Sequence, residues 1–285
     1  MIELVNLTKK FDLFTAVDHL NLQIQTGEFF GLLGPNGAGK TTTIGMMSTL
    51  LLPSEGKLLI DGVELNRHQT ELKRKVSVVT QEYSMRQDMN MLEVMKYQGL
   101  LYHMSDRKIR EKTEELLTFA ELIDFRKRSV RKLSGGMKRK LMVCRALLTE
   151  PEIILLDEPT AGMDALSRRQ MWNMLRKLNG KDLTIVLTTH YMEEAQALCD
   201  RVAFMDKGRL IDVNTPRGYI ETLGNYAVDE HVQEEIVSSF FDTKEKAIEY
   251  LKKTKQKASL RDTTLEDVFV QSMLHSRDER IPDVE

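Results

Sequence analysis

The sequence predicts an α/β fold in which a parallel sheet carries a phosphate-binding loop, and three observations support this. A glycine-rich turn followed by a lysine and two hydroxyl side chains occupies residues 34–42. An apolar run at 29–33, typical of a buried strand, precedes it, and a helical pattern follows it. Short apolar runs return at 153–156 and 183–187, as expected for strands covered on both faces. The turn consists of Gly34, Pro35, Asn36, Gly37, Ala38, Gly39, Lys40, Thr41 and Thr42.

This turn has the residue types that hold a triphosphate. Glycines let the backbone direct its N–H groups toward a phosphate, and the helix start adds partial positive charge. Lys40 would reach the outer phosphates, and the Thr41 hydroxyl would ligate Mg²⁺. The alternative is a fortuitous glycine-rich turn, which the flanking strand and helix disfavour. We therefore expect ATP and Mg²⁺ as cofactors.

Composition narrows the function classes. The 285 residues, 41% of them hydrophobic, can bury a large core, which excludes fibrous and disordered classes. The net charge of −2 predicts no bulk attraction to nucleic acid. Cys144 and Cys199 lack metal-ligand spacing and are expected to fill the core in a reducing compartment. With no run of 18 apolar residues and no signal-like start, we expect neither a membrane span nor export.

The order of patterns along the chain predicts its organisation. Alternation at Leu20, Leu22 and Ile24 favours an antiparallel sheet in the opening section, beside the nucleotide core. A further strand containing Val76 ends at Gln81. Residues from about 84 to 140 read mainly as an inserted helical subdomain, and 202–205 with 210–213 read as a hairpin.

The carboxyl-terminal part is expected to be a small α/β extension. Thr215 followed by Pro216 is typical of a helix start, so we place the boundary between residues 1–215 and 216–285 there. Capping-box patterns at Asp242 with Glu245 and at Thr263 with Glu266 predict two helices.

Two further motifs carry chemistry. The first, Asp157 and Glu158, follows a buried apolar strand. Asp157 fits a carboxylate that binds Mg²⁺, and Glu158 fits a general base; a helix-capping acid pair is the alternative.

In the second motif, Ser134, Gly135 and Gly136 precede a predicted helix at 137–148. Cations in its first turn oppose the helix dipole unless an anion binds there, so we expect a second phosphate cradle rather than a solvated basic face. These cations are Lys138, Arg139 and Lys140.

Taken together, residues 2 to about 215 resemble the ATP-binding cassette ATPases. The resemblance implies a RecA-like phosphate-loop NTPase core with an antiparallel β subdomain and a helical insert. It rests on six segments in family order: the loop at 34–42, Gln81, Leu133–Gly136, Asp157 with Glu158, Ala161–Asp164, and His190 after Thr188 and Thr189.

The resemblance also implies residue roles. Phe11 resembles the aromatic that stacks on adenine, although Phe14 competes and either could belong to the core. Gln81 resembles the residue that senses Mg²⁺ and the attacking water, unless it is only an exposed strand end. His190 resembles the residue that contacts the terminal phosphate and orders the water, with a satisfied polar histidine as the alternative. Asp164 resembles a residue that communicates with a second subunit.

The subtype is suggested by a departure from the common pattern. Met137 stands where many members have glutamine, and Met137-Lys138-Arg139 resembles a variant common in drug and polysaccharide exporters. Residues 265–270 also resemble the terminal motif of those cassettes, although an ordinary amphipathic helix has the same spacing.

Partners follow from the family geometry, which places ATP between the loop of one copy and residues 134–136 of another. We therefore expect a homodimer and, at the cytoplasmic face of the membrane, a separate permease. Methionines could form its docking groove, with core packing as the alternative. The methionines are Met85, Met89, Met91, Met95 and Met104.

A soluble cassette ATPase in iron-sulfur assembly is the second hypothesis for the function, and a repair or translation cassette is the third.

Overall fold

The computed structural model describes residues 1–66, 68–179, 183–233 and 235–278. The chain divides into two compact units. The first contains residues 1–190 and 203–212, and the second contains residues 191–202 and those from 213 onward.

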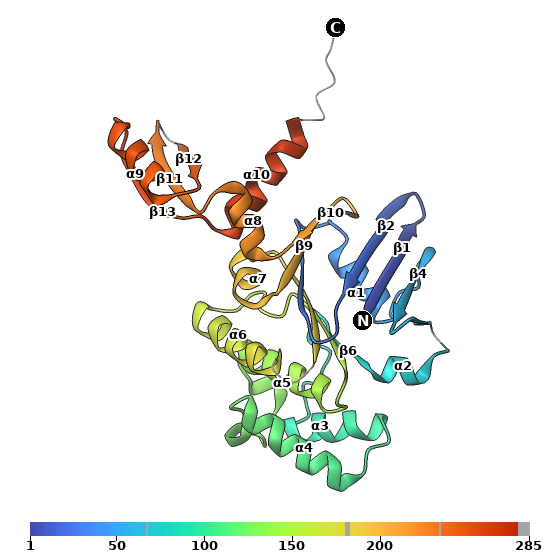
Figure 1. Cartoon of the computed structure of the whole chain (residues 1–285). Helices are drawn as coiled ribbons and strands as arrows, with labels where there is room; N and C mark the ends of the chain where they lie inside the picture. The colour runs from blue at the N-terminus through green and yellow to red at the C-terminus, as the bar shows by residue number, and fades with distance from the viewer. Residues whose placement is uncertain (67, 180–182, 234, 279–285) are drawn as a thin grey trace. The chain divides into compact units, whose positions relative to one another are not determined.

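A six-stranded sheet forms the centre of the first unit, in the order β10-β9-β3-β8-β7-β6 (Figure 1). Strands β6, β7, β8 and β3 run parallel to their neighbours in this series, and every residue of β3, β7 and β8 is buried. This confirms the predicted parallel sheet, whose apolar strands need cover on both faces. The bounds are β3 Phe29–Leu33, β6 Val76–Val79, β7 Ile153–Asp157, β8 Thr184–Thr189, β9 Arg201–Asp206 and β10 Arg209–Asn214.

Helices α1, α2, α5 and α6 belong to the same unit. Helix α1 follows β3 directly, as the phosphate-loop pattern predicts, and the predicted hairpin is confirmed by β9 and β10. Lys207 and Gly208, between those strands, both have positive φ, as a tight hairpin turn requires. The bounds are α1 Lys40–Met47, α2 Thr70–Arg74, α5 Gly135–Leu147 and α6 Ala165–Asn179.

The predicted antiparallel sheet of the opening section is confirmed, in the order β2-β1-β4-β5. The alternation at Leu20, Leu22 and Ile24 lies in β2, and all three side chains are buried. The register between β1 and β2 shifts at three places, so the sequence of β1 does not alternate cleanly. The bounds are β1 Ile2–Phe11, β2 Phe14–Ile24, β4 Glu55–Ile60 and β5 Val63–Glu64.

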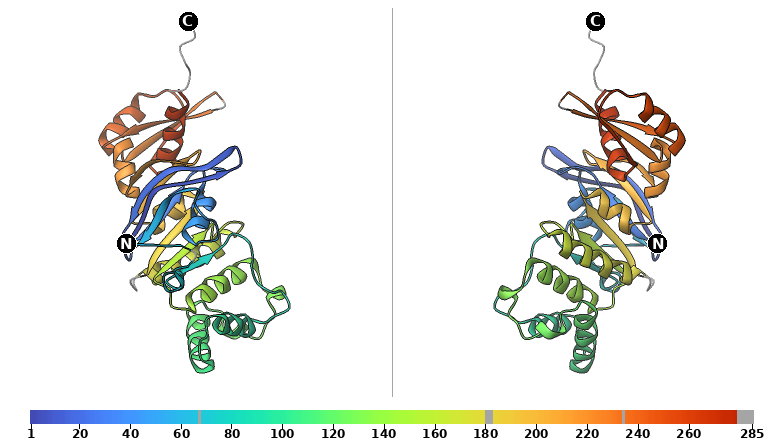
Figure 2. Two further views of the ribbon diagram at one scale, coloured as in Figure 1. Left: turned by 90° about the vertical axis from the view of Figure 1, so that its right-hand side faces the viewer. Right: turned by 90° about the vertical axis from the view of Figure 1, so that its left-hand side faces the viewer.

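The helical insert is also confirmed, and α3 and α4 lie together, away from β1 and β2 (Figure 2). Asn90 and Glu93 form a reciprocal capping box at the start of α3, and Ser105 caps α4. Three of the five methionines of the expected groove, Met85, Met91 and Met95, are buried and belong to the core, whereas Met89 and Met104 are half-buried. The bounds are α3 Met91–Leu101, α4 Asp106–Phe119, η1 Ile123–Phe125 and η2 Val130–Lys132.

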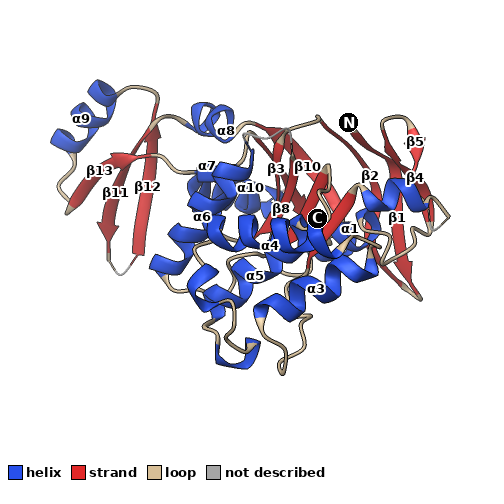
Figure 3. Cartoon of the chain, turned by 90° about the horizontal axis from the view of Figure 1, so that it is seen from below, coloured by secondary structure: helices blue, strands red, loops and turns tan. Residues whose placement is uncertain are grey.

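The second unit contains an antiparallel sheet in the order β12-β11-β13, with α9 beside it (Figure 3). The ring of Tyr250 on α9 lies 5.1 Å from that of Phe241 on β12, and the Tyr250 hydroxyl donates to Glu230 on β11 at 2.6 Å. This is the small α/β extension that the sequence predicts. The bounds are α7 Met192–Leu198, α8 Pro216–Leu223, β11 Tyr226–Val232, β12 Glu235–Phe241, α9 Lys244–Lys253, β13 Ala258–Asp262 and α10 Leu265–Asp278.

Both predicted capping boxes of this unit are wrong by one residue. Thr243, not Asp242, caps α9, by accepting a hydrogen bond from the Lys246 amide. Thr264, not Thr263, caps α10 and accepts from the amide of Asp267, whose carboxylate accepts from the Thr264 amide. In each case two adjacent residues can cap a helix, which explains the error, because local sequence does not decide between them. Thr215 does cap α8, with Pro216 at its first position.

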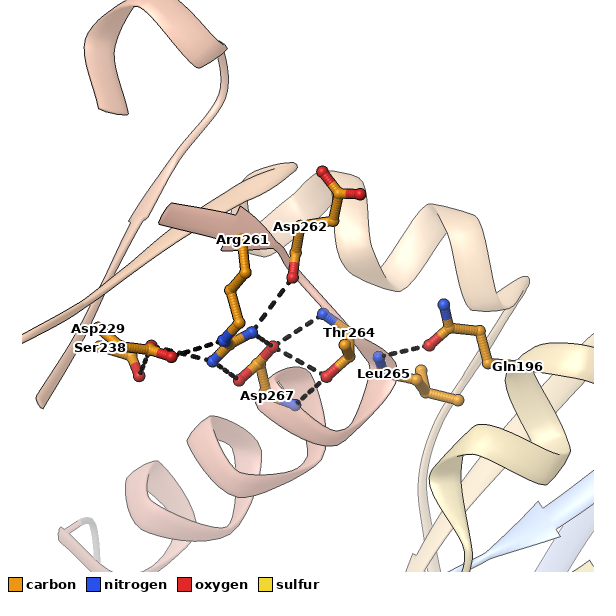
Figure 4. Close-up of polar contacts among 8 residues, drawn as sticks. All are labelled: Gln196, Asp229, Ser238, Arg261, Asp262, Thr264, Leu265 and Asp267. Atoms are coloured by element: carbon orange, nitrogen blue, oxygen red, sulfur yellow. Dashed lines mark hydrogen bonds and ion pairs between the residues drawn. The ribbon is translucent and has the colours of Figure 1, made fainter. Parts of the chain in front are cut away.

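Arg261 on β13 joins three elements of the second unit (Figure 4). Its guanidinium donates to Asp229 on β11 and to Asp267 on α10, each at 2.7 Å. Burial disfavours ionisation of Asp267, but hydrogen bonds from Arg261 and Thr264 outweigh it and lower the pKa of the carboxyl. The Gln196 side chain on α7 accepts from the Leu265 amide at 2.9 Å, which adds a further tie to the start of α10.

We predict that Asp267→Asn loosens α10, because one substitution removes the ion pair and weakens the cap. The expected loss is about 1–3 kcal/mol in local opening free energy, seen as faster amide hydrogen exchange in α10. Because the pKa is lowered, this contribution is present above about pH 3.9 and is lost as pH falls through the lowered pKa. The control is Glu266→Gln at the exposed neighbouring position, and equal exchange in the two variants would contradict the prediction.

Candidate functional site

The phosphate loop leaves the start of α1 open to an anion. Gly39 occupies the N-cap with φ of 98°, so no side chain caps the helix, and its first turn holds no acid. A Cβ at Gly39 would lie 2.5 Å from the carbonyl oxygen of Ala16, so only glycine fits. The first amide groups of a helix have no intrahelical acceptors, so this end can hold a phosphate.

Lys40 lies inside this loop. Its Nζ donates to the carbonyl oxygens of Gly34 at 2.8 Å and Pro35 at 3.1 Å, and the residue is 6% exposed. Burial lowers the pKa of Lys40, and the negative charges of Glu158 and Asp157 partly offset this effect. A bound phosphate would add compensating negative charge, so the buried cation fits an anionic ligand.

Asp157 ends β7 next to the loop. Its Oδ1 accepts from the hydroxyl of Thr41 at 3.2 Å and from that of Thr188 on β8 at 2.5 Å. A hydroxyl and a carboxylate that converge beside a phosphate loop are ligands that Mg²⁺ uses together with phosphate oxygens and water. Among the described residues, no group of three or more His, Cys, Asp or Glu side chains could hold a metal alone. The Thr41 hydroxyl and the Asp157 carboxylate fit a magnesium ion that is bound together with a nucleotide phosphate.

Glu158 and His190 form the second pair of the site. They follow the adjacent parallel strands β7 and β8, and Nδ1 of His190 lies 3.2 Å from Oε1 of Glu158. The Glu158 side chain is 11% exposed and that of His190 is 39% exposed. Glu158 has φ of 46°, and its amide donates to the carbonyl of Thr188 at 3.1 Å. Positive φ is uncommon for residues other than glycine, and here it occurs at a candidate site.

Arg139 connects the Gln81 segment to this pair. Its guanidinium donates to the carbonyl oxygens of Thr80 at 2.7 Å, Gln81 at 2.9 Å and Glu158 at 3.4 Å. The Gln81 side chain is exposed. The sequence did not reveal this role of Arg139, because its partners are carbonyl groups, which leave no residue pattern.

The same contacts correct the argument for a basic phosphate cradle. Arg139 faces the interior, and Lys140 pairs with Glu121 at 3.7 Å. Two of the three cations are therefore held by other partners, and the helix begins at Gly135 rather than Met137.

We predict that Arg139→Met lowers the free energy of unfolding by about 2–4 kcal/mol, because three carbonyl groups lose a buried charged donor. Urea denaturation would measure this, and the ATP turnover rate should fall with it, since Gln81 and Glu158 lose a shared anchor. Lys138→Met is the matched control at the neighbouring, less buried position. A stability equal to that of the control would contradict the prediction.

Ser134 and Asp164 both act as helix caps. The Ser134 hydroxyl accepts from the Met137 amide at 3.2 Å, and Asp164 accepts from the amide and the hydroxyl of Ser167 at 2.9 and 2.7 Å. Hydrogen bonds from Ser167 lower the pKa of Asp164. In the described part of the chain, no hydrogen bond or ion pair joins Ser134, Gly135 or Gly136 to residues 34–42.

Phe11 and Phe14 are paired opposite each other at the end of the β1–β2 hairpin. They are 43% and 61% exposed, so neither belongs to the core, which removes that alternative. Lys9 Nζ lies 5.0 Å above the Phe11 ring. The structure thus leaves both rings accessible to a planar ligand.

Comparisons with known proteins identify the family. The ABC transporter family matches residues 17–161. Nod factor export ATP-binding protein I of Cupriavidus metallidurans is 38% identical over 222 residues, which is 78% of this chain and 73% of the relative. Linearmycin resistance ATP-binding protein LnrL of Bacillus subtilis is 34% identical over 79% of this chain and 72% of its own length.

A solved structure extends the agreement to the fold. The dimeric structure of a post-hydrolysis state of the ATP-binding cassette MJ0796 bound to ADP and Pi is 30% identical, with a TM-score of 0.69. The match covers 75% of this chain and 98% of that one. The chain belongs to the ABC transporter family and is an ATP-binding cassette ATPase subunit.

Proposed function

We propose that this chain is the ATP-hydrolysing subunit of an exporter, with residues 1–215 as the cassette domain and 216–285 as an extension. The observation that carries the proposal is the Glu158–His190 pair beside Asp157 and the uncapped start of α1. Phe11, the loop at 34–42, and Ser134, Gly135, Gly136 and Asp164 would bind ATP. Thr41, Gln81 and Asp157 would hold Mg²⁺, and Glu158, His190 and Gln81 would act in catalysis.

The carboxylate of Glu158 would accept the proton of the attacking water. Nδ1 of His190 lies 3.2 Å from Oε1 of Glu158, and an imidazolium with hydrogen on both ring nitrogens would donate both to Glu158 and to the terminal phosphate. Bound Mg²⁺ would supply neutralisation of the charge that develops on the phosphate oxygens. Lys40 and the open amides of α1 would keep the phosphates in position.

The working unit would be a dimer in which Ser134, Gly135 and Gly136 complete the site of the other copy. About three charge-assisted hydrogen bonds per ATP, each worth about 1.5–3 kcal/mol, contribute on the order of 10–20 kcal/mol over two sites. Association costs roughly 4–15 kcal/mol, so ATP would close the dimer only marginally. Loss of the terminal phosphate would then reopen it.

The shared site can be tested by complementation. Ser134→Arg and Lys40→Met should each be inactive alone, since one blocks the signature segment and the other removes the loop cation. A mixture should recover at most about a quarter of the wild-type rate, because half of randomly paired dimers are mixed and each holds one intact site. Full turnover by Ser134→Arg alone would contradict a shared site.

A separate permease would form the transport path. Among the described helices, none is long and apolar enough to cross a bilayer. The relatives carry export and resistance functions in their names, and none of those compared supports the iron-sulfur alternative. We therefore place the subunit at the cytoplasmic face of the membrane. Purification from solubilised membranes should yield an integral membrane protein with this chain, and purely soluble companions would favour the alternative.

A further inference from the structure

Strand β12 is an unprotected sheet edge in the second unit. In the described part of the chain, β12 pairs only with β11, so its outer side has no strand partner. Natural edge strands usually carry lysine, proline or another device that blocks association. Residues 235–241 contain no lysine, arginine or proline, and their one charged residue, Glu235, stands at the first position of the strand.

The same strand exposes apolar side chains. Ile236 is 63% exposed and Val237 is 46% exposed, although the two lie on opposite faces of the sheet. Helix α9 covers the face of Phe241, and the other face borders a cavity of about 610 Å³ lined by Ile236, Phe240 and Val270 among others. An apolar edge of this kind is suited to receive another strand.

The sequence of β12 is complementary to itself when two copies run antiparallel. The strand has seven residues, and its middle residue is Ser238. Pairing about Ser238 uses the whole strand and places Ile236 opposite Phe240 twice, a β-branched and aromatic pair that stabilises sheets. Val237 then lies opposite Ser239, and Glu235 opposite Phe241, so no like charges face each other.

We propose that β12 pairs antiparallel with β12 of a second copy of this chain, about a two-fold axis at Ser238. The two three-stranded sheets then form one continuous sheet of six strands. A second copy is the occupant that the observations favour, because the strand is its own complement and the compared cassette structure is a dimer.

This contact goes beyond the ATP-dependent closure proposed above. One pair of seven-residue strands buries less than the roughly 1,200 Å² of a stable interface, so it acts as a weak tether. A tether raises the effective concentration of the two cassettes for each other. The copies then remain associated when no nucleotide is bound, and ATP closes a dimer that is already assembled.

Cysteine cross-linking of the full chain tests the register. Ser238→Cys should form a disulfide-linked dimer under mild oxidation without nucleotide, because paired residues on antiparallel strands lie about 4.5–5.5 Å apart between Cα atoms. Background is low because Cys144 and Cys199 are both buried. Ile236→Cys should not cross-link to itself, since its two copies are about 13 Å apart, but it should cross-link to Phe240→Cys.

The controls separate this contact from chance collisions and from the ATP site. Ser259→Cys, exposed on the opposite edge strand β13, should form no disulfide-linked dimer. Adding Val237→Lys should reduce the Ser238→Cys dimer severalfold, whereas adding Lys40→Met should leave it unchanged, so failure of the ATP mechanism does not affect the result. The proposal would be overturned if Ser238→Cys formed no disulfide-linked dimer, or if Ile236→Cys alone gave as much of that dimer as Ser238→Cys does. A cross-link from Ser238→Cys to a different protein in membranes would also overturn it.

Discussion

Glu158→Gln is expected to lower the ATP turnover rate by about 10²–10⁴-fold while ATP binding persists. Glutamine keeps the shape of the side chain but removes the carboxylate that would accept the proton from water. Because the terminal phosphate then stays in place, the closed dimer should accumulate. Single-turnover hydrolysis would measure the rate, and size-exclusion chromatography with Mg-ATP would measure the dimer.

Glu152→Gln is the matched control for this substitution, because Glu152 directly precedes the same strand at its other end. Its side chain is 58% exposed and forms an ion pair with Lys75. Turnover should remain at the wild-type level. Normal hydrolysis by Glu158→Gln, or a variant that stays monomeric with Mg-ATP, would remove Glu158 from the role of general base.

Lys40→Met is expected to weaken ATP binding by at least about 100-fold, because two charge-assisted hydrogen bonds to phosphate would be lost. Stability without nucleotide should change less than ATP binding, because removal of a buried charge offsets the loss of the hydrogen bonds to the carbonyl oxygens of Gly34 and Pro35. Burial lowers the pKa of Lys40, so the folded chain disfavours the charged ammonium at any pH where lysine is ordinarily charged. Methionine carries no charge and removes this cost. The clearest readout is therefore the ATP-induced rise in Tm, which at 100 times the Kd corresponds to about 2.7 kcal/mol in the wild type.

Lys57→Met on the exposed part of β4 is the control for a lost surface lysine. It should keep the full ATP-induced shift. A Lys40→Met variant with that same shift would show that the ammonium does not hold phosphate.

The parts of the fold that the sequence predicts are those with local patterns. The loop at 34–42 combines glycine, lysine and hydroxyl residues whose spacing follows from phosphate geometry. Asp157 and Glu158 stand out because two acids interrupt an apolar strand, and the structure places Asp157 within 3.2 Å of the Thr41 hydroxyl. Strands β3, β7 and β8 are apolar throughout because both faces are covered.

The features that the sequence did not predict depend on contacts across the fold. Arg139 looks like one of three surface cations, and only the packed structure directs it to the carbonyl groups of Thr80, Gln81 and Glu158. The methionines at 85, 91 and 95 fit either a groove or a core by composition, and burial alone decides between them. The roles of Ser134 and Asp164 toward a second copy stay predictions, because one chain shows them only as helix caps.

The left-handed backbone at Glu158 limits how this ATPase could become inactive during evolution. With φ of 46°, the position tolerates asparagine, aspartate or glycine, whereas valine, isoleucine or threonine would strain the main chain as well as remove the carboxylate. In copies of such a gene that have lost hydrolysis, we therefore expect asparagine, aspartate or glycine at this position. Such a subunit would still fold and still bind nucleotide.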